Sequence, residues 1–139
     1  MVELFKIYEE CEKINSHIYI FNKGSYEACT IEQQGIYDIC INSKKIDTIS
    51  NLKTKLMHEW GHCKTGATHS VSSPFELVGK NEERANRTAI KQFIPFCEIK
   101  KAVNNGLTEY WQLAEYFNLE EVFIRKAVNY YINVCGYLL

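Results

Sequence analysis

Residues 50–64 read SNLKTKLMHEWGHCK, and their pattern is that of an amphipathic helix. Apolar side chains recur at the spacing that places them on one side of an α-helix, at Leu52, Leu56, Trp60 and Cys63. His58 and His62 fall roughly on the opposite side of the same helix. We therefore expect the apolar stripe to pack on other elements while the two histidines face a cleft.

The motif at the centre of this helix is HExxH, formed by His58, Glu59 and His62. Residues four apart lie one above the other on a helix, so both imidazoles can reach a single ion. Glu59 is rotated by one residue, and it can take a proton from a water that the metal polarises. The sequence thus predicts a metal centre with two histidine ligands and Glu59 as the general base.

A third protein ligand is needed, because catalytic zinc sites use three side chains and leave one position for water. Residues 81–94 are predicted to be helical, and Glu82 shares the inward face of that helix with Ala85. Glu83 is turned by about 100° and is expected in solvent. Gly61 lowers helix propensity by about 1 kcal/mol relative to alanine, which makes sense if another backbone or a substrate passes close to it. We predict Glu82 as the third ligand, on a helix that approaches closely.

The elements expected around these two helices belong to an α+β domain. Residues 2–14 have helical periodicity, and strands are expected at 17–21, 26–33 and 36–42. Residues 65–79 carry glycine, proline and several Ser/Thr, which indicates a loop. Residues 96–139 form a helical C-terminal subregion with expected breaks near 104–106 and 118. Because no linker or repeat divides the chain, we predict a single domain over residues 1–139.

Three short segments together resemble the ImmA/IrrE-type metallo-endopeptidases: HEWGH at 58–62, EERAN at 82–86 and FIP at 93–95. That family pairs an HExGH helix with a later ExxA(D/N) helix that ends in an apolar-Pro sequence. The similarity covers roughly residues 35–130, and it is strongest to the short versions carried by prophages and integrative elements. The chain departs from the family pattern at three positions, none of which is a ligand. Trp60 stands where an aliphatic residue is common, Asn86 where aspartate is more usual, and Thr88 where an aromatic residue is usual.

The resemblance implies a zincin-like metalloprotease fold in which His58, His62 and Glu82 hold zinc and Glu59 is the general base. A set of two histidines and one glutamate also tolerates Mn²⁺. The resemblance further implies an endopeptidase whose protein substrate is a helix-turn-helix repressor, and whose cleavage derepresses a mobile element or a stress regulon.

The alternative hypothesis is a zincin-like binding module without catalysis, or a DNA-binding accessory protein. Residues 113–127 have a residue pattern similar to that of a helix-turn-helix motif. However, Glu120 and Glu121 begin the second helix, whereas a recognition helix presents hydrogen-bond donors or basic groups to DNA at this end. We expect no direct nucleic-acid binding, and instead a helical hairpin that covers the catalytic core or receives a partner protein. Glu59 argues against a pure binder, which needs no general base.

Two further features leave alternatives open. The strand at 36–42, which includes Tyr37, is either the edge along which an extended substrate is added or an ordinary interior strand. His69 is either an oxyanion or substrate contact or an exposed loop histidine.

The charge and cysteine content narrow the classes of protein. A net charge of −1, from 16 basic and 17 acidic residues, gives no broad electrostatic surface for nucleic acid. Six cysteines without a CxxC pair are expected to be reduced, buried thiols. The N-terminus has no basic region followed by an apolar run, and no apolar run reaches the length of a membrane span. We therefore expect a cytoplasmic protein without a membrane partner.

Overall fold

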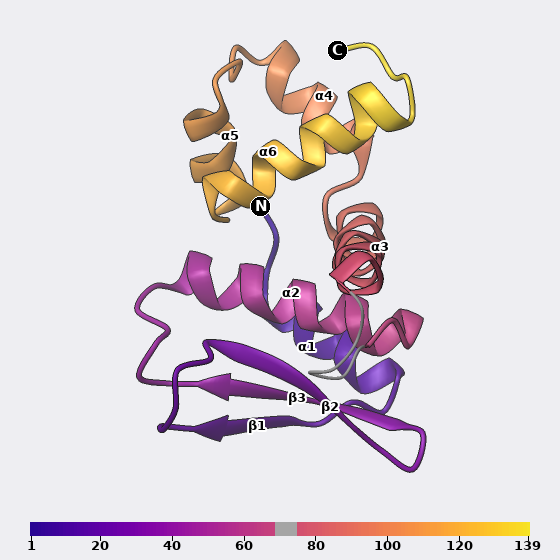
Figure 1. Cartoon of the computed structure of the whole chain (residues 1–139). Coiled ribbons are helices and arrows are strands. Elements are labelled where there is room, and N and C mark those ends of the chain that lie inside the picture. The colour runs from indigo at the N-terminus through magenta and orange to yellow at the C-terminus, as the bar shows by residue number, and fades with distance from the viewer. Residues whose placement is uncertain (69–74) are drawn as a thin grey trace.

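The computed structural model describes residues 1–68 and 75–139, and it has the expected α+β architecture (Figure 1). Within these residues, six α-helices and one π-helical segment accompany a sheet of three strands. The elements in chain order are α1 (Leu4–Lys13), β1 (Ile18–Phe21), β2 (Ala28–Gln33), β3 (Ile36–Asn42), α2 (Ile49–Thr65), α3 (Phe75–Phe93), α4 (Phe96–Asn104), α5 (Tyr110–Phe117), α6 (Glu121–Asn129) and η1 (Tyr130–Val134).

The sheet has the order β1-β3-β2, so β3 is its central strand. β1 runs parallel to β3, and β2 runs antiparallel to it, with Thr30 opposite Ile39. The interpretation of strand 36–42 as an edge for substrate is therefore wrong, and Tyr37 lies on an interior strand. Alternating apolar residues indicate a strand with one buried face. They do not show whether the strand pairs with other strands on one side or on both, so the pattern alone does not give the strand order. Among the described residues, β1 and β2 are the two edge strands.

Helices cover one face of this sheet in successive layers (Figure 1). α1 and α2 lie next to the sheet, α3 packs against α2, and the helices from α4 onward lie farther away. The core between sheet and helices contains buried side chains from β3 and α2, among them Ile39, Ile41, Leu56, Met57 and Trp60. The apolar stripe that the sequence predicts for α2 thus packs inward.

The N-terminal residues connect α2 with the C-terminal helices. The Lys53 ammonium is buried and donates a 2.6 Å hydrogen bond to the Val2 carbonyl, and burial lowers its pKa. The Val2 N–H in turn donates to the carbonyl of Phe117 at 3.4 Å. The Glu120 N–H donates to the Thr54 hydroxyl of α2 at 3.1 Å. These bonds hold the start of α6 beside α2.

Both ends of α2 have capping interactions. The Thr48 hydroxyl accepts a 3.1 Å hydrogen bond from the Asn51 N–H, which satisfies one of the unpaired donors of the first turn. Gly66 ends the helix in the left-handed conformation at φ 66°, and its N–H donates to the His62 carbonyl at 2.9 Å. The helix expected over 50–64 is therefore confirmed to within one residue at each end.

Gly61 lies at a close contact between α2 and α3. A Cβ atom at this position would be 2.8 Å from the carbonyl carbon of Ala85 and closer still to its oxygen. Ala85 and Ala89 are fully buried along the same face of α3. The expectation that another backbone passes close to Gly61 is confirmed, and small side chains on α3 allow this approach.

We expect Gly61→Ala to lower the free energy of unfolding by about 2 kcal/mol, because the added methyl group forces the two backbones apart. Gly79→Ala, in α3, is the matched control. Nothing lies within 4 Å of a Cβ at position 79. Alanine there should stabilise the helix by up to about 1 kcal/mol. Urea unfolding of the two variants gives both values, and a stabilising Gly61→Ala would contradict the close approach of α2 and α3.

The loop expected over residues 65–79 is wrong for its last five residues, because α3 begins at Phe75 and includes Gly79. Glycine lowers local helix propensity, but Glu76 in the first turn interacts favourably with the unpaired N–H groups there. The helical C-terminal subregion is confirmed as far as Val134. Its breaks fall as expected, with positive φ at Gly106 (96°) and Asn118 (54°).

All six cysteines are free thiols, as expected, but the expectation that they are buried is correct only for Cys11 and Cys63. Cys97 is exposed, and the other three are partly buried. Burial raises the pKa of the Cys11 thiol to about 12. Within residues 1–68 and 75–139, no helix combines the length and the apolar character that crossing a membrane requires.

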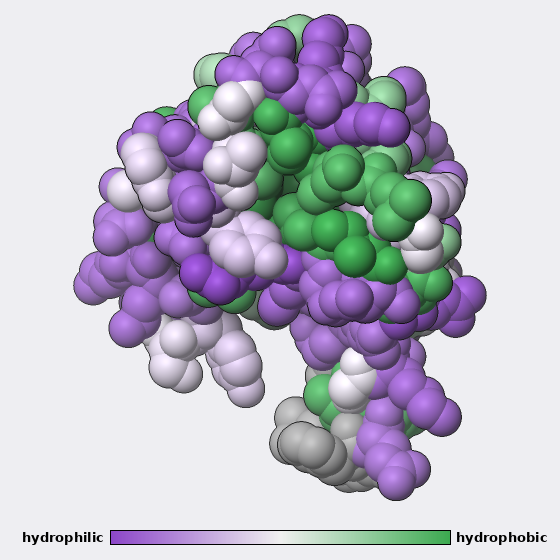
Figure 2. Space-filling model, turned by 90° about the horizontal axis from the view of Figure 1, so that it is seen from above, coloured by the Kyte–Doolittle hydropathy of each residue, from purple (hydrophilic) through white to green (hydrophobic). Residues whose placement is uncertain are grey.

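The C-terminal helices present an apolar patch. Figure 2 views this side of the molecule, and apolar side chains gather there in one area bordered by hydrophilic ones. The exposed large apolar residues of the last helical segment and the residues after it are Val134, Tyr137, Leu138 and Leu139. Exposed patches of this kind occur where proteins bind partners. A partner protein for these helices stays a prediction.

Candidate metal centre

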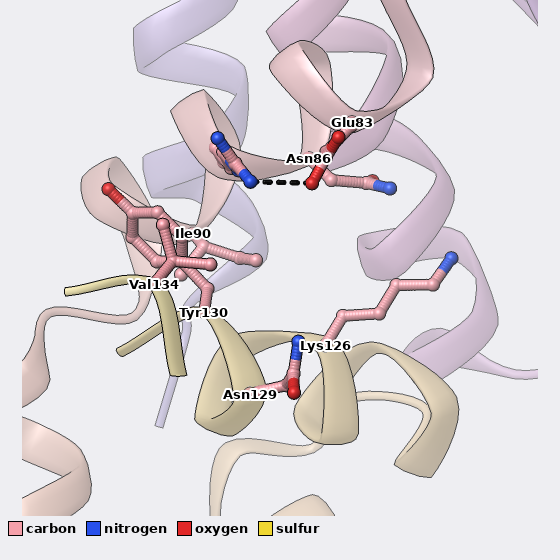
Figure 3. A pocket seen from close by; sticks show the side chains of 8 residues that line it. Glu83, Asn86, Ile90, Lys126, Asn129, Tyr130 and Val134 are labelled. Atoms are coloured by element: carbon pink, nitrogen blue, oxygen red, sulfur yellow. Dashed lines mark hydrogen bonds and ion pairs between the residues drawn. The ribbon is translucent and has the colours of Figure 1, made fainter. Parts of the chain in front are cut away.

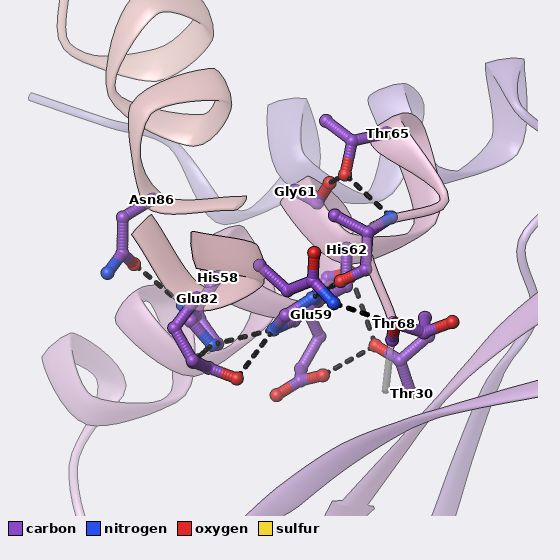
Figure 4. A network of polar contacts seen from close by, with 11 residues as sticks. Thr30, His58, Glu59, Gly61, His62, Thr65, Thr68, Glu82 and Asn86 are labelled. Atoms are coloured by element: carbon purple, nitrogen blue, oxygen red, sulfur yellow. Dashed lines mark hydrogen bonds and ion pairs between the residues drawn. The ribbon is translucent and has the colours of Figure 1, made fainter. Parts of the chain in front are cut away.

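His58 and His62 lie one turn apart on α2, and their imidazoles approach each other (Figure 4). The two Nε2 atoms are 3.1 Å apart, and the rings meet edge to face at 88°. His62 is buried and only 5% exposed, whereas His58 is partly buried. The spacing of four residues therefore brings both rings to one place, as the sequence predicts.

α3 brings Glu82 to both imidazoles. One carboxylate oxygen lies 2.7 Å from His58 Nε2, and the other lies 3.1 Å from His62 Nε2. Glu83 is exposed and pairs with Arg87 instead, at 2.5 Å. The structure thus brings together the three side chains predicted as ligands and leaves Glu83 outside the group.

The three ligand atoms all lie within 4.8 Å of one another, so the group could hold a metal ion. Zinc bonds of about 2.0–2.1 Å in a tetrahedral arrangement separate neighbouring ligand atoms by about 3.3 Å. The two Nε2 atoms are 3.1 Å apart, and each lies 2.7–3.1 Å from one of the two Glu82 oxygens, slightly less than this value. The group therefore has the size that one ion requires, although the identity of the ion does not follow from it.

Each histidine has an oxygen acceptor at its other ring nitrogen. His58 Nδ1 lies 2.6 Å from the side-chain oxygen of Asn86, and His62 Nδ1 lies 2.6 Å from the carbonyl of Ala67. Because both acceptors are oxygens, both Nδ1 atoms carry the proton. With a metal bound, the lone pairs of Nε2 would then face the shared site, which is the tautomer that metal-binding histidines adopt. Asn86 supplies the acceptor for His58 from α3.

Glu59 lies beside the ligand group without belonging to it (Figure 4). Glu59 is buried, with only 7% of the residue exposed. The Thr30 hydroxyl of β2 donates a 2.5 Å hydrogen bond to Oε2 of Glu59. This bond fixes one carboxylate oxygen and leaves the other available for a further contact. Thr30 carries no signal in the sequence, because it lies 29 residues from Glu59 and meets it only through the packing of β2 on α2.

Two of the ligand side chains, Glu82 and His62, have shifted pKa values. Hydrogen bonds from His58 and then from His62 hold the pKa of the Glu82 carboxyl far below its usual range. Burial disfavours the charged imidazole of His62, but its hydrogen bonds with Glu82 and with the Ala67 carbonyl outweigh burial and raise its pKa. In the absence of metal, Glu82 is thus an anion that stabilises a proton on the imidazole of His62.

A cleft of about 330 Å³ opens beside the ligand group, between α2, α3 and the start of α6. His58 and Glu82 line it on one side, and Phe123 and Lys126 line it on the other. The expectation that the histidines face a cleft is met by His58. His69, a candidate substrate contact, lies outside the described residues.

We expect zinc affinity to fall by at least about tenfold from pH 7.5 to pH 5.5, because protons compete for the histidine nitrogens. The raised pKa of His62 places part of this loss at a higher pH than an ordinary imidazole would. Competition titrations with a chromophoric chelator at four pH values measure the effect. A zinc affinity that does not change across this range would contradict ligation by the two histidines.

Comparisons of this chain with protein-family models, with curated protein sequences and with solved structures found no match.

Proposed function

We propose that this chain is a zinc-dependent metallo-endopeptidase with a zincin-like fold, of the ImmA/IrrE type. The observation that carries this proposal is the arrangement of His58, His62 and Glu82 around one point, with the buried carboxylate of Glu59 beside them. A structural metal site is closed by four protein ligands, whereas three ligands and a neighbouring carboxylate are typical of hydrolytic sites. The three ligands are the group that would hold the zinc, and Mn²⁺ is compatible with them.

Zinc bound by these residues would polarise a carbonyl and lower the pKa of a water molecule. Glu59 accepts the proton of the attacking water and passes it to the nitrogen of the cleaved bond. Thr30 holds one oxygen of this carboxylate, so that the carboxylate does not rotate freely. Asn86 and the Ala67 carbonyl keep the two imidazoles in the required tautomer.

We propose that an extended substrate binds along the outer edge of β2. β2 is an edge strand, and its residue Thr30 contacts Glu59 directly. A peptide that pairs with this edge would therefore run past the catalytic carboxylate. Peptide addition to a sheet edge takes its affinity from main-chain hydrogen bonds and its selectivity from side-chain pockets.

The protein substrate that we propose is a helix-turn-helix repressor of a mobile element or a stress regulon, as the sequence resemblance implies. The test incubates the zinc-loaded chain with the helix-turn-helix repressor encoded next to its own gene and follows the products by mass spectrometry. We expect cleavage at one or two sites, which EDTA stops and stoichiometric zinc restores. Binding of the intact repressor without any cut would favour the alternative, a non-catalytic binding module.

A further inference from the structure

Two cysteines lie directly opposite each other in the sheet. Cys29 of β2 and Cys40 of β3 are partners in the antiparallel register, and two residues along, the Asn42 N–H donates to the carbonyl of Glu27 at 2.9 Å. Pairs that exchange main-chain hydrogen bonds alternate with pairs that do not, so Cys29 and Cys40 also form a hydrogen-bonded pair, with Cα atoms about 5.5 Å apart. Disulfides most often join Cα atoms about 5.5–6 Å apart. The backbone therefore already holds these two cysteines at the separation that a disulfide requires.

Both side chains lie on the face of the sheet that points away from the helices (Figure 1). The residues on either side of Cys40 are buried in the core between sheet and helices, so Cys40 itself points to the opposite face. Thr30, the residue after Cys29, contacts Glu59 of α2, so Cys29 also points away from the helices. Both cysteines are only partly buried, and a small molecule in solution can therefore reach them.

The two thiols hydrogen-bond to each other, and this bond makes them unequal. Burial raises the pKa of both thiols, that of Cys29 to about 11. The hydrogen bond between them raises the pKa of Cys29 further and lowers that of Cys40. The Cys40 thiolate is therefore the first to form, because the Cys29 S–H donates to it. Raised pKa values slow the attack on a disulfide at neutral pH, but they do not change the equilibrium between two neutral thiols and a disulfide.

The other four cysteines, all within the described residues, are placed differently. Cys11 and Cys63 are buried in the core, where a reagent in solution does not reach them. Cys135 hydrogen-bonds with Tyr130, which lines the cavity between α3, α6 and η1 (Figure 3). Cys97 is exposed in the first turn of α4. Cys29 and Cys40 thus combine facing backbones with access from solvent.

We propose that Cys29 and Cys40 are a redox site, at which a small-molecule disulfide such as oxidised glutathione converts the two thiols to a disulfide. The Cys40 thiolate attacks one sulfur of the reagent, so that a mixed disulfide forms and one glutathione thiolate leaves. The Cys29 thiolate then attacks the Cys40 sulfur, and the second glutathione thiolate leaves as the Cys29–Cys40 bond forms. The two departing thiolates take up the two protons that the cysteines lose. The protein is thereby oxidised by two electrons, and the reagent is reduced to two thiols.

The new bond would lie on a partly exposed face, and accessible disulfides are the ones that thiols reduce again. The reaction is therefore reversible. It involves neither the metal ligands nor Glu59, so this site is independent of the proposed peptidase function.

The experiment equilibrates the full chain in buffers of reduced and oxidised glutathione, alkylates the remaining thiols in denaturant and maps the peptides by mass spectrometry. Trypsin releases residues 24–44 as one peptide that contains Cys29, Cys40 and no other cysteine. We expect this peptide to be unalkylated and lighter by two hydrogen atoms after the oxidising buffer. It should be alkylated twice after the oxidised protein has been returned to the reducing buffer. Cleavage after Glu32, which lies between the two cysteines, should leave the two halves joined.

The matched control moves one thiol two residues along the same face of β2, by combining Cys29→Ser with Ile31→Cys. Ile31 is 43% exposed and lies opposite Asp38, so a cysteine there is a diagonal neighbour of Cys40, about 7–8 Å away. Because cysteines more than about 7 Å apart are not bridged without movement of the backbone, we expect at least about tenfold less internal disulfide than in the wild type.

Two results would overturn the proposal. Equal amounts of internal disulfide in the control and in the wild type would show that closeness in the sequence, and not the register of the sheet, brings the thiols together. A peptide 24–44 that stays doubly alkylated in a buffer that already attaches glutathione to the exposed Cys97 would show that Cys29 and Cys40 do not react.

Discussion

Glu82→Ala should lower zinc affinity by at least about 100-fold. Removing a residue that only hydrogen-bonds to a zinc ligand already lowers affinity by about 10–100-fold, and Glu82 is proposed as a ligand itself. The Glu82 carboxylate lies within 3.1 Å of both imidazoles, and it is the negatively charged member of the group formed by His58, His62 and Glu82. Its removal leaves two neutral nitrogens, which hold a divalent ion weakly. Elemental analysis of identically purified proteins measures the result, and we expect about one zinc per chain in the wild type and almost none in the variant.

Glu83→Ala is the control for this experiment. Glu83 is the next residue in α3, and it is exposed and paired with Arg87 rather than with a histidine. The variant should keep its zinc. Loss of zinc in Glu83→Ala alone would place the third ligand one residue further along the helix. A wild-type protein that holds no metal even when zinc is supplied would favour the non-catalytic binding module.

Glu59→Gln should lower the rate of peptide cleavage by about 10²–10⁴-fold, which is the usual contribution of a general base. Glutamine has nearly the shape of glutamate, and its amide oxygen can still accept the hydrogen bond from Thr30. The amide has no site for the proton of the attacking water, however. Because Glu59 is not one of the ligands, the zinc content should remain that of the wild type.

The comparison must be made at equal zinc content, with turnover measured on the same substrate. Glu76→Gln is a suitable control, because it makes the same chemical change at an exposed position in the first turn of α3. It should leave turnover unchanged. Cleavage by Glu59→Gln at the wild-type rate would show that Glu59 is not the base, even if the metal centre is as described.

The three side chains that could hold a metal ion were predictable because local helix geometry determines which residues share a face. A spacing of four residues places His58 and His62 on one face, whatever the remainder of the fold is. The choice of Glu82 over Glu83 followed from the buried face of the same helix, where Ala85 is now seen to be fully buried. Gly61 was informative for a similar reason, because a glycine inside a helix needs an explanation.

The contacts that support these residues could not be predicted, since they join separate parts of the chain. Thr30 reaches Glu59 only because β2 packs on α2. The Ala67 carbonyl reaches His62 only because Gly66 turns the chain back at the end of the helix. The order of the strands is also a tertiary property, which is why the position of β3 could not be inferred from its alternation.

The ligands of the candidate centre come from two different helices, with His58 and His62 on α2 and Glu82 on α3. An ion at this point would join two layers of the fold, so its binding energy would also be folding energy. Free zinc at 1,000 times its dissociation constant would add about 4 kcal/mol to the stability of the native state. Since marginally stable chains are degraded faster in cells, the lifetime of this protein would then follow the supply of zinc.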